Sequence, residues 1–223
     1  CFVVARIFAA RAGIARHSNR RKLSQRPASF AILCRRRSTA LLVSGDIGGR
    51  KERGVAFGKE EVCAYLDERG VVYDRVDHEA VFTMEAMDAL ELPFAEAVVK
   101  NLFLRDDKKR NYYLVVMPED KPANLKALRV ALEARPLRFA SEEDLHGILG
   151  LRGGAVSPFG VLNDEEGKVQ VVFDEVLRDW PAVGVHPNDN TATLRVPLSD
   201  LLALFEDRAV PYRFVDMDVA PAQ

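Results

Sequence analysis

The sequence has little of what several familiar protein classes need. Only three cysteines occur in 223 residues, Cys1, Cys34 and Cys63, and no two of them form a Cys-x-x-Cys pair. Neither a disulfide framework nor a cysteine-based metal site is therefore expected, and such cysteine usage is typical of a reducing, cytoplasmic setting. No apolar run reaches the roughly 18 residues that a membrane-spanning helix needs, so we expect no membrane association.

Common catalytic and nucleotide-binding motifs are also missing. The chain has no Gly-x-x-x-x-Gly-Lys-Ser/Thr loop, no His-Glu-x-x-His pair and no Gly-x-Ser-x-Gly turn. These absences give no support to a P-loop, a zinc site or a serine nucleophile. We expect neither a metal nor another cofactor, and in an enzyme of this kind the nucleophile would be water or part of the substrate.

Charge divides the chain into two segments. Residues 1–55 carry 13 Lys/Arg against two acidic residues, a net charge of +11, whereas residues 56–223 carry 19 bases and 31 acids, a net charge of −12. The first segment is rich in Arg and Ser and shows no periodic core, which is typical of a transit peptide, an upstream extension or another disordered leader. A basic arm that holds nucleic acid is a further alternative. We therefore place the folded domain in residues 56–223.

The pattern from residue 56 onward predicts a single α+β domain. Hairpin-like connections outnumber helical crossovers, which favours a mixed, largely antiparallel, curved central sheet flanked by helices. Ser141 and Asp144 have the spacing of a helix capping box, with Asp in place of the usual Glu. The expected helices are 59–69, 84–92, 125–134, 141–149 and 199–208, and the expected strands are 71–78, the two arms of a hairpin over 97–116, 169–177 and 192–198.

One cation is out of place in the predicted hairpin. Lys100 follows Val98 and Val99 and precedes Leu102, in a strand that otherwise alternates like a half-buried one. A strand lysine is ordinarily explained by its reach to solvent. Its neighbour Asn101 would point to the opposite face of a regular strand.

Two loops carry the remaining candidate residues. The segment 150–164 is rich in Gly and Pro and contains Gly154 and Pro158 as Gly-x-x-x-Pro, and His186 lies in the loop 184–191. Each has an ordinary alternative, a turn in the first case and a structural histidine in the second. Their joint occurrence with Lys100 is what calls for a functional explanation.

In this order and spacing, these residues resemble the YbaK/prolyl-tRNA-synthetase-associated family of free-standing editing domains. The resemblance covers residues 57–217 and includes VDHEAVFTMEAM, VVKNLFLRD, GLRGGAVSPFGVLND and HPNDNTATLRV. Within the family the chain is most similar to the alanyl deacylases of the PrdX/ProXp-ala type. The resemblance implies an aminoacyl-tRNA deacylase that hydrolyses the ester of a mischarged tRNA(Pro), with Ala-tRNA(Pro) as the preferred substrate.

The resemblance also implies roles for the candidate residues. Lys100 would meet the terminal ribose, phosphate or ester oxygen, and Asn101 would join it through either a strand bulge or a contribution from the other face. Gly154 would let backbone N–H groups approach the carbonyl, Pro158 would fix the loop, and His186 would line the pocket. A ribose hydroxyl of the substrate would activate the water. The implied catalytic set is Lys100, Asn101, Gly154 and His186.

Selectivity would come from a pocket too small for proline. The implied substrate-binding residues are Phe82, Thr83, Met84, Val98 and Pro158, with Met87 as a further wall residue, although ordinary core packing explains the apolar ones equally well. The implied partners are the acceptor end of tRNA(Pro) and prolyl-tRNA synthetase, and we expect a monomer. Two alternatives remain open: a Cys-tRNA(Pro) deacylase and a non-catalytic aminoacyl-tRNA or amino-acid binding module.

Overall fold

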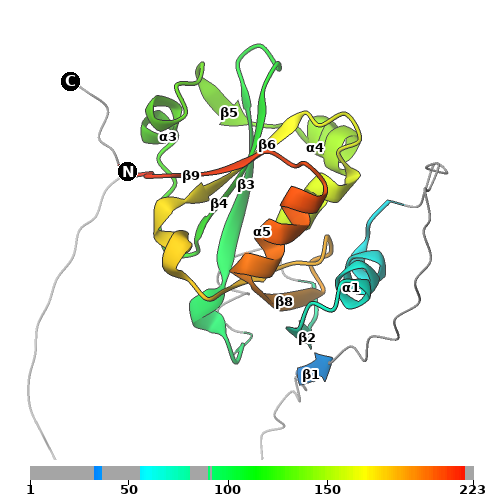
Figure 1. The fold of residues 1–223 in the computed structure, drawn as a ribbon. Helices are drawn as coiled ribbons and strands as arrows, with labels where there is room; N and C mark the ends of the chain where they lie inside the picture. Colours follow the sequence, from blue (N-terminus) through cyan, green and yellow to red (C-terminus); the bar gives the residue numbers. More distant parts are fainter. Residues whose placement is uncertain (1–32, 37–55, 81–89, 91, 219–223) are drawn as a thin grey trace, which may run out of the picture. The chain divides into compact units, whose positions relative to one another are not determined.

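The structure, a computed structural model, describes residues 33–36, 56–80, 90 and 92–218 (Figure 1). The predicted helix 84–92 therefore lies almost wholly outside the described residues. The described helices are α1 (Lys59–Glu68), α3 (Leu125–Ala131), α4 (Glu142–Leu149) and α5 (Leu198–Asp207), with 3₁₀-helices η1 (Ala95–Ala97), η2 (Pro158–Asn163) and η3 (Glu175–Asp179). In the part of the chain that is described, no helix is long and apolar enough to cross a bilayer.

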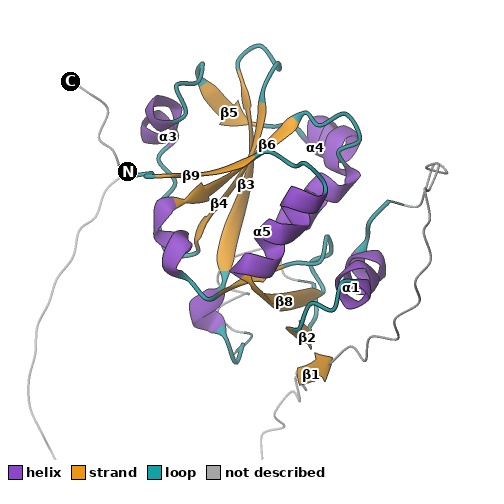
Figure 2. Cartoon of the chain, viewed as in Figure 1, coloured by secondary structure: helices purple, strands orange, loops and turns teal. Residues whose placement is uncertain are grey.

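The described strands form two sheets (Figure 2). One has the order β5-β3-β4-β6-β9, antiparallel from β5 to β4 and parallel from β4 to β9. The other has the order β1-β2-β8-β7 and is antiparallel throughout. The α+β prediction with a mixed sheet is confirmed. The strands are β1 (Leu33–Arg36), β2 (Tyr73–Asp77), β3 (Val99–Asp106), β4 (Tyr112–Pro118), β5 (Leu137–Phe139), β6 (Val169–Asp174), β7 (Ala182–Val185), β8 (Ala192–Pro197) and β9 (Tyr212–Val215).

The strand β4 is buried along its whole length because both faces of its sheet are covered. Leu114 and Val116 belong to the main core, which also takes in apolar side chains of α1, α4 and α5. Val115 and Met117 face the opposite way, into a smaller core that includes residues of α3. The alternation follows the period of two along a strand, so neighbouring residues of β4 serve different cores.

The ends of two helices follow from local chemistry. Ser141 caps α4, since its side chain accepts the N–H of Asp144 at 3.1 Å while the Asp144 carboxylate accepts the N–H of Ser141 at 3.4 Å. The helix ends at Gly150, whose φ of +66° is a left-handed conformation that glycine adopts without strain. The capping box expected from the sequence is therefore present. Asn124 caps α3 without such a box, since its side-chain oxygen accepts the N–H groups of Lys126 and Ala127, each at 3.1 Å.

Several boundaries differ from the sequence-based expectation. The helix predicted over 125–134 ends at Ala131, because Glu133 takes a left-handed φ of +52°. The strand predicted over 169–177 ends at Asp174, which caps η3. Strands β5, β7 and β9 were not predicted; they are only three or four residues long and depend on pairing with distant strands. In the expected leader, β1 pairs with β2 from Leu33↔Val76 to Arg36↔Tyr73.

Candidate functional site

Lys100 and Asn101 lie on a strand of unbroken register. Lys100 pairs with Met117 and Asn101 with Val116, and the antiparallel ladder continues to Arg105 without an extra residue. A bulge at this position, one of the two ways in which Asn101 could have joined Lys100, is therefore absent. Asn101 faces the side of Val99 and Phe103, and any contribution that it makes comes from the face opposite to Lys100.

The two side chains have different surroundings. Lys100 is half-buried, and its Nζ donates a hydrogen bond to the main-chain oxygen of Glu119 at 2.9 Å, in the loop that follows β4. The Oδ1 atom of Asn101 is buried and accepts no hydrogen bond from the described part of the chain. A buried amide oxygen without a hydrogen-bond donor costs free energy. Asparagine at position 101 therefore does not serve the stability of the fold.

The two sheets meet where the lysine strand begins. Val98 forms an isolated parallel bridge with Gly184, two residues before Lys100 and two residues before His186. A Cβ on Gly184 would lie 3.1 Å from the Cα of Val98 and 3.3 Å from the carbonyl oxygen of Ala97. Glycine is needed here because the backbones approach more closely than a side chain permits. This contact brings the predicted residues Val98, Lys100 and His186 toward one junction.

The Gly-x-x-x-Pro loop adjoins the histidine loop. Gly154 has a φ of +84°, a left-handed conformation, and Pro158 is the buried first residue of η2. Ser157, between them, is buried, and its hydroxyl donates a hydrogen bond to the main-chain oxygen of His186. The two loops that the sequence singled out are therefore in direct contact.

His186 is held with a defined tautomer. Its Nδ1 lies 2.8 Å from the main-chain oxygen of Ala192, and because a carbonyl only accepts, Nδ1 carries the proton. Burial lowers the pKa of the imidazole, and nearby His78 lowers it further, against the opposing effects of the Ala192 carbonyl and Asp189. The ring is neutral at pH 7, so Nε2 carries a lone pair that can accept a proton or a hydrogen bond.

A second histidine lies beside it. The ring centroids of His78 and His186 are 6.1 Å apart, and His78 is itself fixed by the main-chain oxygen of Glu79 at 2.8 Å and by the hydroxyl of buried Thr193 at 3.0 Å. Neither His78 nor Thr193 was predicted as a site residue. The fragment VDHEAVFT contains the histidine, but a single histidine after a strand carries no signal of its partner. The pairing of strand β2 with strand β8 brings His78 next to Thr193.

Polar contacts also fix the far end of the histidine loop. Lys59, at the start of α1, donates to the hydroxyl of Thr191 at 2.7 Å and lies 3.4 Å from Asp77. The Thr191 hydroxyl in turn donates to Asp189. Burial would raise the pKa of Asp189, but the hydrogen bonds from Thr191 and the charge of Lys59 lower it overall. Asp189 is therefore ionised at neutral pH, next to a neutral His186.

Three comparisons with known proteins bear on the family and the fold. The model of the aminoacyl-tRNA editing domain matches residues 78–204, more than half of the chain. The chain belongs to the aminoacyl-tRNA editing domain family. The resemblance drawn from the sequence and the enzyme class that it implied, an aminoacyl-tRNA deacylase, are thereby confirmed.

Individual relatives of this editing domain are similar over most of their length. The prolyl-tRNA editing protein ProX of Acetoanaerobium sticklandii is 42% identical over 159 residues, which are 71% of this chain and 97% of the relative. Prolyl-tRNA synthetase associated domain-containing protein 1 of Danio rerio is 34% identical, over 67% of this chain and 82% of the relative. A solved structure of a candidate trans-editing enzyme for prolyl tRNA synthetase has a TM-score of 0.53 at 22% identity, covering 73% of this chain and 99% of its own, and supports the fold.

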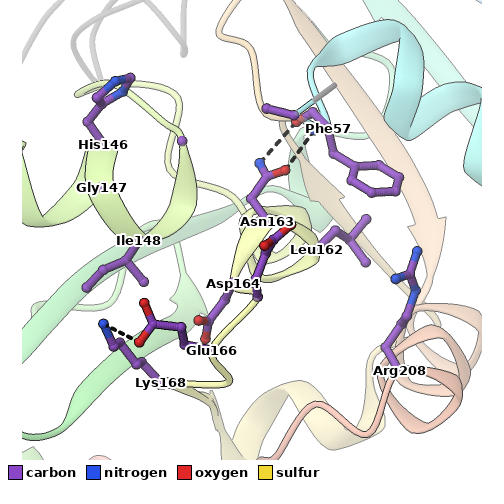
Figure 3. A pocket seen from close by; sticks show the side chains of 13 residues that line it. Phe57, His146, Gly147, Ile148, Leu162, Asn163, Asp164, Glu166, Lys168 and Arg208 are labelled. Atoms are coloured by element: carbon purple, nitrogen blue, oxygen red, sulfur yellow. Dashed lines mark hydrogen bonds and ion pairs between the residues drawn. The ribbon is translucent and has the colours of Figure 1, made fainter. Parts of the chain in front are cut away.

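A pocket of about 640 Å³ elsewhere in the editing domain is not this site (Figure 3). None of the predicted site residues that the structure describes lines it. Its charged side chains include Asp164 and Glu166, and Lys168 is already paired with Glu166 at 2.8 Å. Carboxylates repel the phosphates of an RNA acceptor end, so the pocket is a poor place for an aminoacyl-tRNA. Phe82, Thr83, Met84 and Met87 lie outside the described residues.

Proposed function

We propose that the protein is a trans-editing hydrolase that deacylates mischarged tRNA(Pro), with Ala-tRNA(Pro) as its preferred substrate. The names of its relatives, a prolyl-tRNA editing protein and prolyl-tRNA synthetase associated proteins, support this substrate class. The single observation that carries it is the contact between Ser157 and the His186 main chain, beside the junction at Val98. This contact and the bridge between Val98 and Gly184 together join three segments that are distant in the sequence, as a reaction centre requires.

The reaction is the attack of water on the aminoacyl ester. The bond between the carbonyl carbon and the ribose oxygen of the terminal adenosine breaks, giving a free amino acid and an uncharged tRNA end. Negative charge develops on the carbonyl oxygen in the transition state, and a cation or N–H donors placed there lower the barrier. Lys100 supplies the cation, and the backbone around Gly154 supplies N–H donors.

His186 acts in this scheme as a hydrogen-bond acceptor. Because its Nδ1 donates to Ala192, its Nε2 carries the lone pair, which in this proposal accepts a hydrogen bond from the α-ammonium group or a ribose hydroxyl. The ribose hydroxyl orients the attacking water, so the substrate supplies part of its own catalysis. Asn101 takes part from the opposite face of β3, through its Oδ1, which has no hydrogen-bond donor among the described residues.

Selectivity rests on exclusion by size. Val98 and Pro158 are buried, and together with Phe82, Thr83 and Met84 they would form walls that admit a small side chain and refuse the proline ring. Steric exclusion is stronger than discrimination by a missing methylene, which is worth roughly 1–3 kcal/mol. The preference for alanine over cysteine is a more specific proposal than the exclusion of proline.

The acceptor end of tRNA(Pro) is the proposed contact, with prolyl-tRNA synthetase as the protein partner. The net charge of −12 on residues 56–223 opposes broad binding to phosphate. Two basic residues that could bind phosphate are already in ion pairs. Lys121 pairs with the buried carboxylate of Asp174 at 2.7 Å, and Lys109 pairs with Asp144 at 3.2 Å. We therefore expect modest affinity that is concentrated at the aminoacylated end.

Residues 56–223 are the proposed catalytic unit. The main chain of Phe57 is bonded on both sides, to Asn163 at 2.7 Å and to Asn188 at 2.7 Å, so the unit starts at or before residue 56. Removing residues 1–55 also removes β1 and leaves β2 as an edge strand. We expect the truncated protein to keep its activity.

The test is hydrolysis of Ala-, Cys- and Pro-tRNA(Pro) by the full chain, by residues 56–223 and by Lys100→Ala. We expect rapid loss of alanine only, by both lengths of chain, and a rate lower by about 100-fold or more in the variant. The variant should unfold at the same temperature as the wild type, because the Lys100 side chain makes one hydrogen bond to a loop carbonyl. Lys126→Ala, an exposed lysine of α3, is the matched control.

Each other outcome points to a different function. Preferred hydrolysis of Cys-tRNA(Pro) would assign the same chemistry to cysteine. No turnover of any substrate, with measurable binding, would favour a non-catalytic binding module. A folded but inactive truncated protein would make residues 1–55 an RNA-holding arm.

A further inference from the structure

Two buried side chains join the loops that carry Gly154 and His186. Ser157 is fully buried, and its hydroxyl is used twice, as the donor to the main-chain oxygen of His186 and as the acceptor of the Phe159 N–H at 3.2 Å. A hydroxyl has one proton, so its direction is determined by these two partners. The carbonyl of His186 is thereby fixed against the Gly-x-x-x-Pro loop.

Asn188 makes the second connection, two residues further along the histidine loop. It is 7% exposed, and its Nδ2 donates to the main-chain oxygens of Phe57 at 2.7 Å and Phe159 at 3.3 Å. Its φ of +59° is left-handed, a conformation that asparagine tolerates better than most residues other than glycine. One side chain therefore ties the histidine loop to η2 and to the segment before α1.

We propose that Ser157 and Asn188 are positioning residues, which set the distance and orientation of His186 relative to the Gly154–Pro158 loop. This inference rests on the proposed function, because it assigns the two loops to one reaction centre. His186 is held at three points: its carbonyl by Ser157, its ring by Ala192, and the chain that follows it by Asn188. The direction of Nε2 is then a consequence of buried hydrogen bonds.

Burial of these polar groups is a poor way to gain stability alone. Each needs complete hydrogen bonding to offset its loss of hydration, and the Oδ1 of Asn188 is buried without a partner among the described residues. A glycine at position 188 would take the same backbone conformation without strain. Compared with glycine, asparagine adds two N–H donors, which bond to Phe57 and Phe159. These bonds fix the position of the histidine loop relative to η2 and to the segment before α1.

Asn163 provides a matched control from the other side of Phe57. Its Oδ1 accepts the Phe57 N–H at 2.7 Å, and its Nδ2 donates to the main-chain oxygens of Leu149 at 2.9 Å and Phe57 at 3.3 Å. It thus makes three hydrogen bonds, one more than Asn188, but it joins Phe57 to the end of α4, and among the described residues it has no such bond to the histidine loop. Its removal tests the cost of losing buried hydrogen bonds in general.

The experiment compares Ser157→Ala, Asn188→Gly and Asn163→Ala in the full chain. Hydrolysis of Ala-tRNA(Pro) is measured over a range of substrate concentrations up to saturation, well below the unfolding temperature, which gives the maximal rate and KM. The melting temperature and the nitrogen-15 NMR signals of the His186 ring are measured for the same proteins. We expect the first two variants to lose about tenfold or more in maximal rate with little change in KM, since small displacements are costly in catalysis. Their His186 signals should broaden or shift, whereas Asn163→Ala keeps wild-type signals and rate despite a comparable fall in melting temperature.

The proposal fails if the rate follows the melting temperature alike in all three variants, or if Asn188→Gly keeps both the wild-type rate and the wild-type His186 signals. The second result would mean that only the left-handed backbone matters. Absence of hydrolysis by the wild type would overturn the proposed function instead, and the NMR comparison would still decide whether Ser157 and Asn188 orient the ring.

Discussion

The five-stranded and four-stranded sheets contribute to the candidate site in different ways. The first presents Lys100 and Asn101 in the middle of a regular ladder, where each side chain's direction follows from its place in the strand. The second presents His186 just after β7 ends, where its direction depends on hydrogen bonds to Ser157 and Ala192. The direction of a strand side chain is thus set by its place in the strand, whereas the direction of the loop side chain of His186 is set by hydrogen bonds to residues from other segments.

Two polar side chains, one on each sheet, also differ in how well their hydrogen bonds are satisfied. On the four-stranded sheet, buried Thr193 has His78 as its partner at 3.0 Å, while Asn101 on the five-stranded sheet has a buried oxygen with no donor among the described residues. An unsatisfied group in a regular strand is a cost that the fold does not require. The predictions below test this contrast between the two sheets, beginning with the largest effect.

Substitution of Asn101 by Leu should change activity and stability in opposite directions. Loss of the amide is expected to lower the rate of Ala-tRNA(Pro) hydrolysis by about 100-fold, while removal of an unpaired buried oxygen raises the free energy of unfolding by roughly 1 kcal/mol. Hydrolysis assays and urea unfolding measure the two effects. Thr193→Val is the control from the other sheet and should lose stability, since its hydroxyl has a partner. A less stable Asn101→Leu would contradict this account.

Substitution of Gly184 by Ala tests the junction between the sheets. The new Cβ would meet the Val98 backbone at 3.1 Å and the Ala97 oxygen at 3.3 Å, so the two strands must separate. We expect a loss of about 1–3 kcal/mol in unfolding free energy and a drop of about tenfold in hydrolysis. Gly147→Ala, in α4 with open space around its Cβ, is the control and should be neutral or stabilising. If the two variants had equal stability and equal rates of hydrolysis, the close contact between Val98 and Gly184 would not be needed for either.

The pH profile should report the neutral state of His186. Its pKa in the folded protein lies below the ordinary 6.5, so the unfolded chain takes up this proton first as the pH falls. Stability should therefore decline below about pH 6.5 and level off once the folded histidine is also protonated. Hydrolysis should hold its rate to a pH below 6.5 and then fall about tenfold per unit. In His186→Gln this acid limb should disappear; its persistence would assign the limb to another group.

The smallest effect is expected from His78→Gln. His78 lowers the pKa of His186, so its removal should raise that pKa and move the acid limb to higher pH. The shift is modest because burial is the larger cause of the lowered pKa. Glutamine keeps a hydrogen-bonding side chain next to Thr193, and the maximal rate should change little. A limb that stays in place would show that the two rings do not interact.

Local patterns predicted much of the fold from the sequence. The hairpin around Lys100, the capping box at Ser141 and the end of α4 at Gly150 all follow from residues within a few positions of one another. Family motifs predicted the candidate residues themselves, and the structure brings the Gly-x-x-x-Pro loop and His186 into contact. Those predictions needed only strand period, capping chemistry and motif order.

Tertiary structure alone decided the rest. Short strands such as β7 and β9 have too few residues for a periodic signal, and they exist because β8 and β6 offer them partners. The tautomer of His186, the approach of Val98 to Gly184 and the neighbouring His78 depend on segments that are distant in the sequence. A sequence determines which side chains are available; only the packed chain determines which of them meet, because hydrogen bonds and burial between distant segments form when the strands pair.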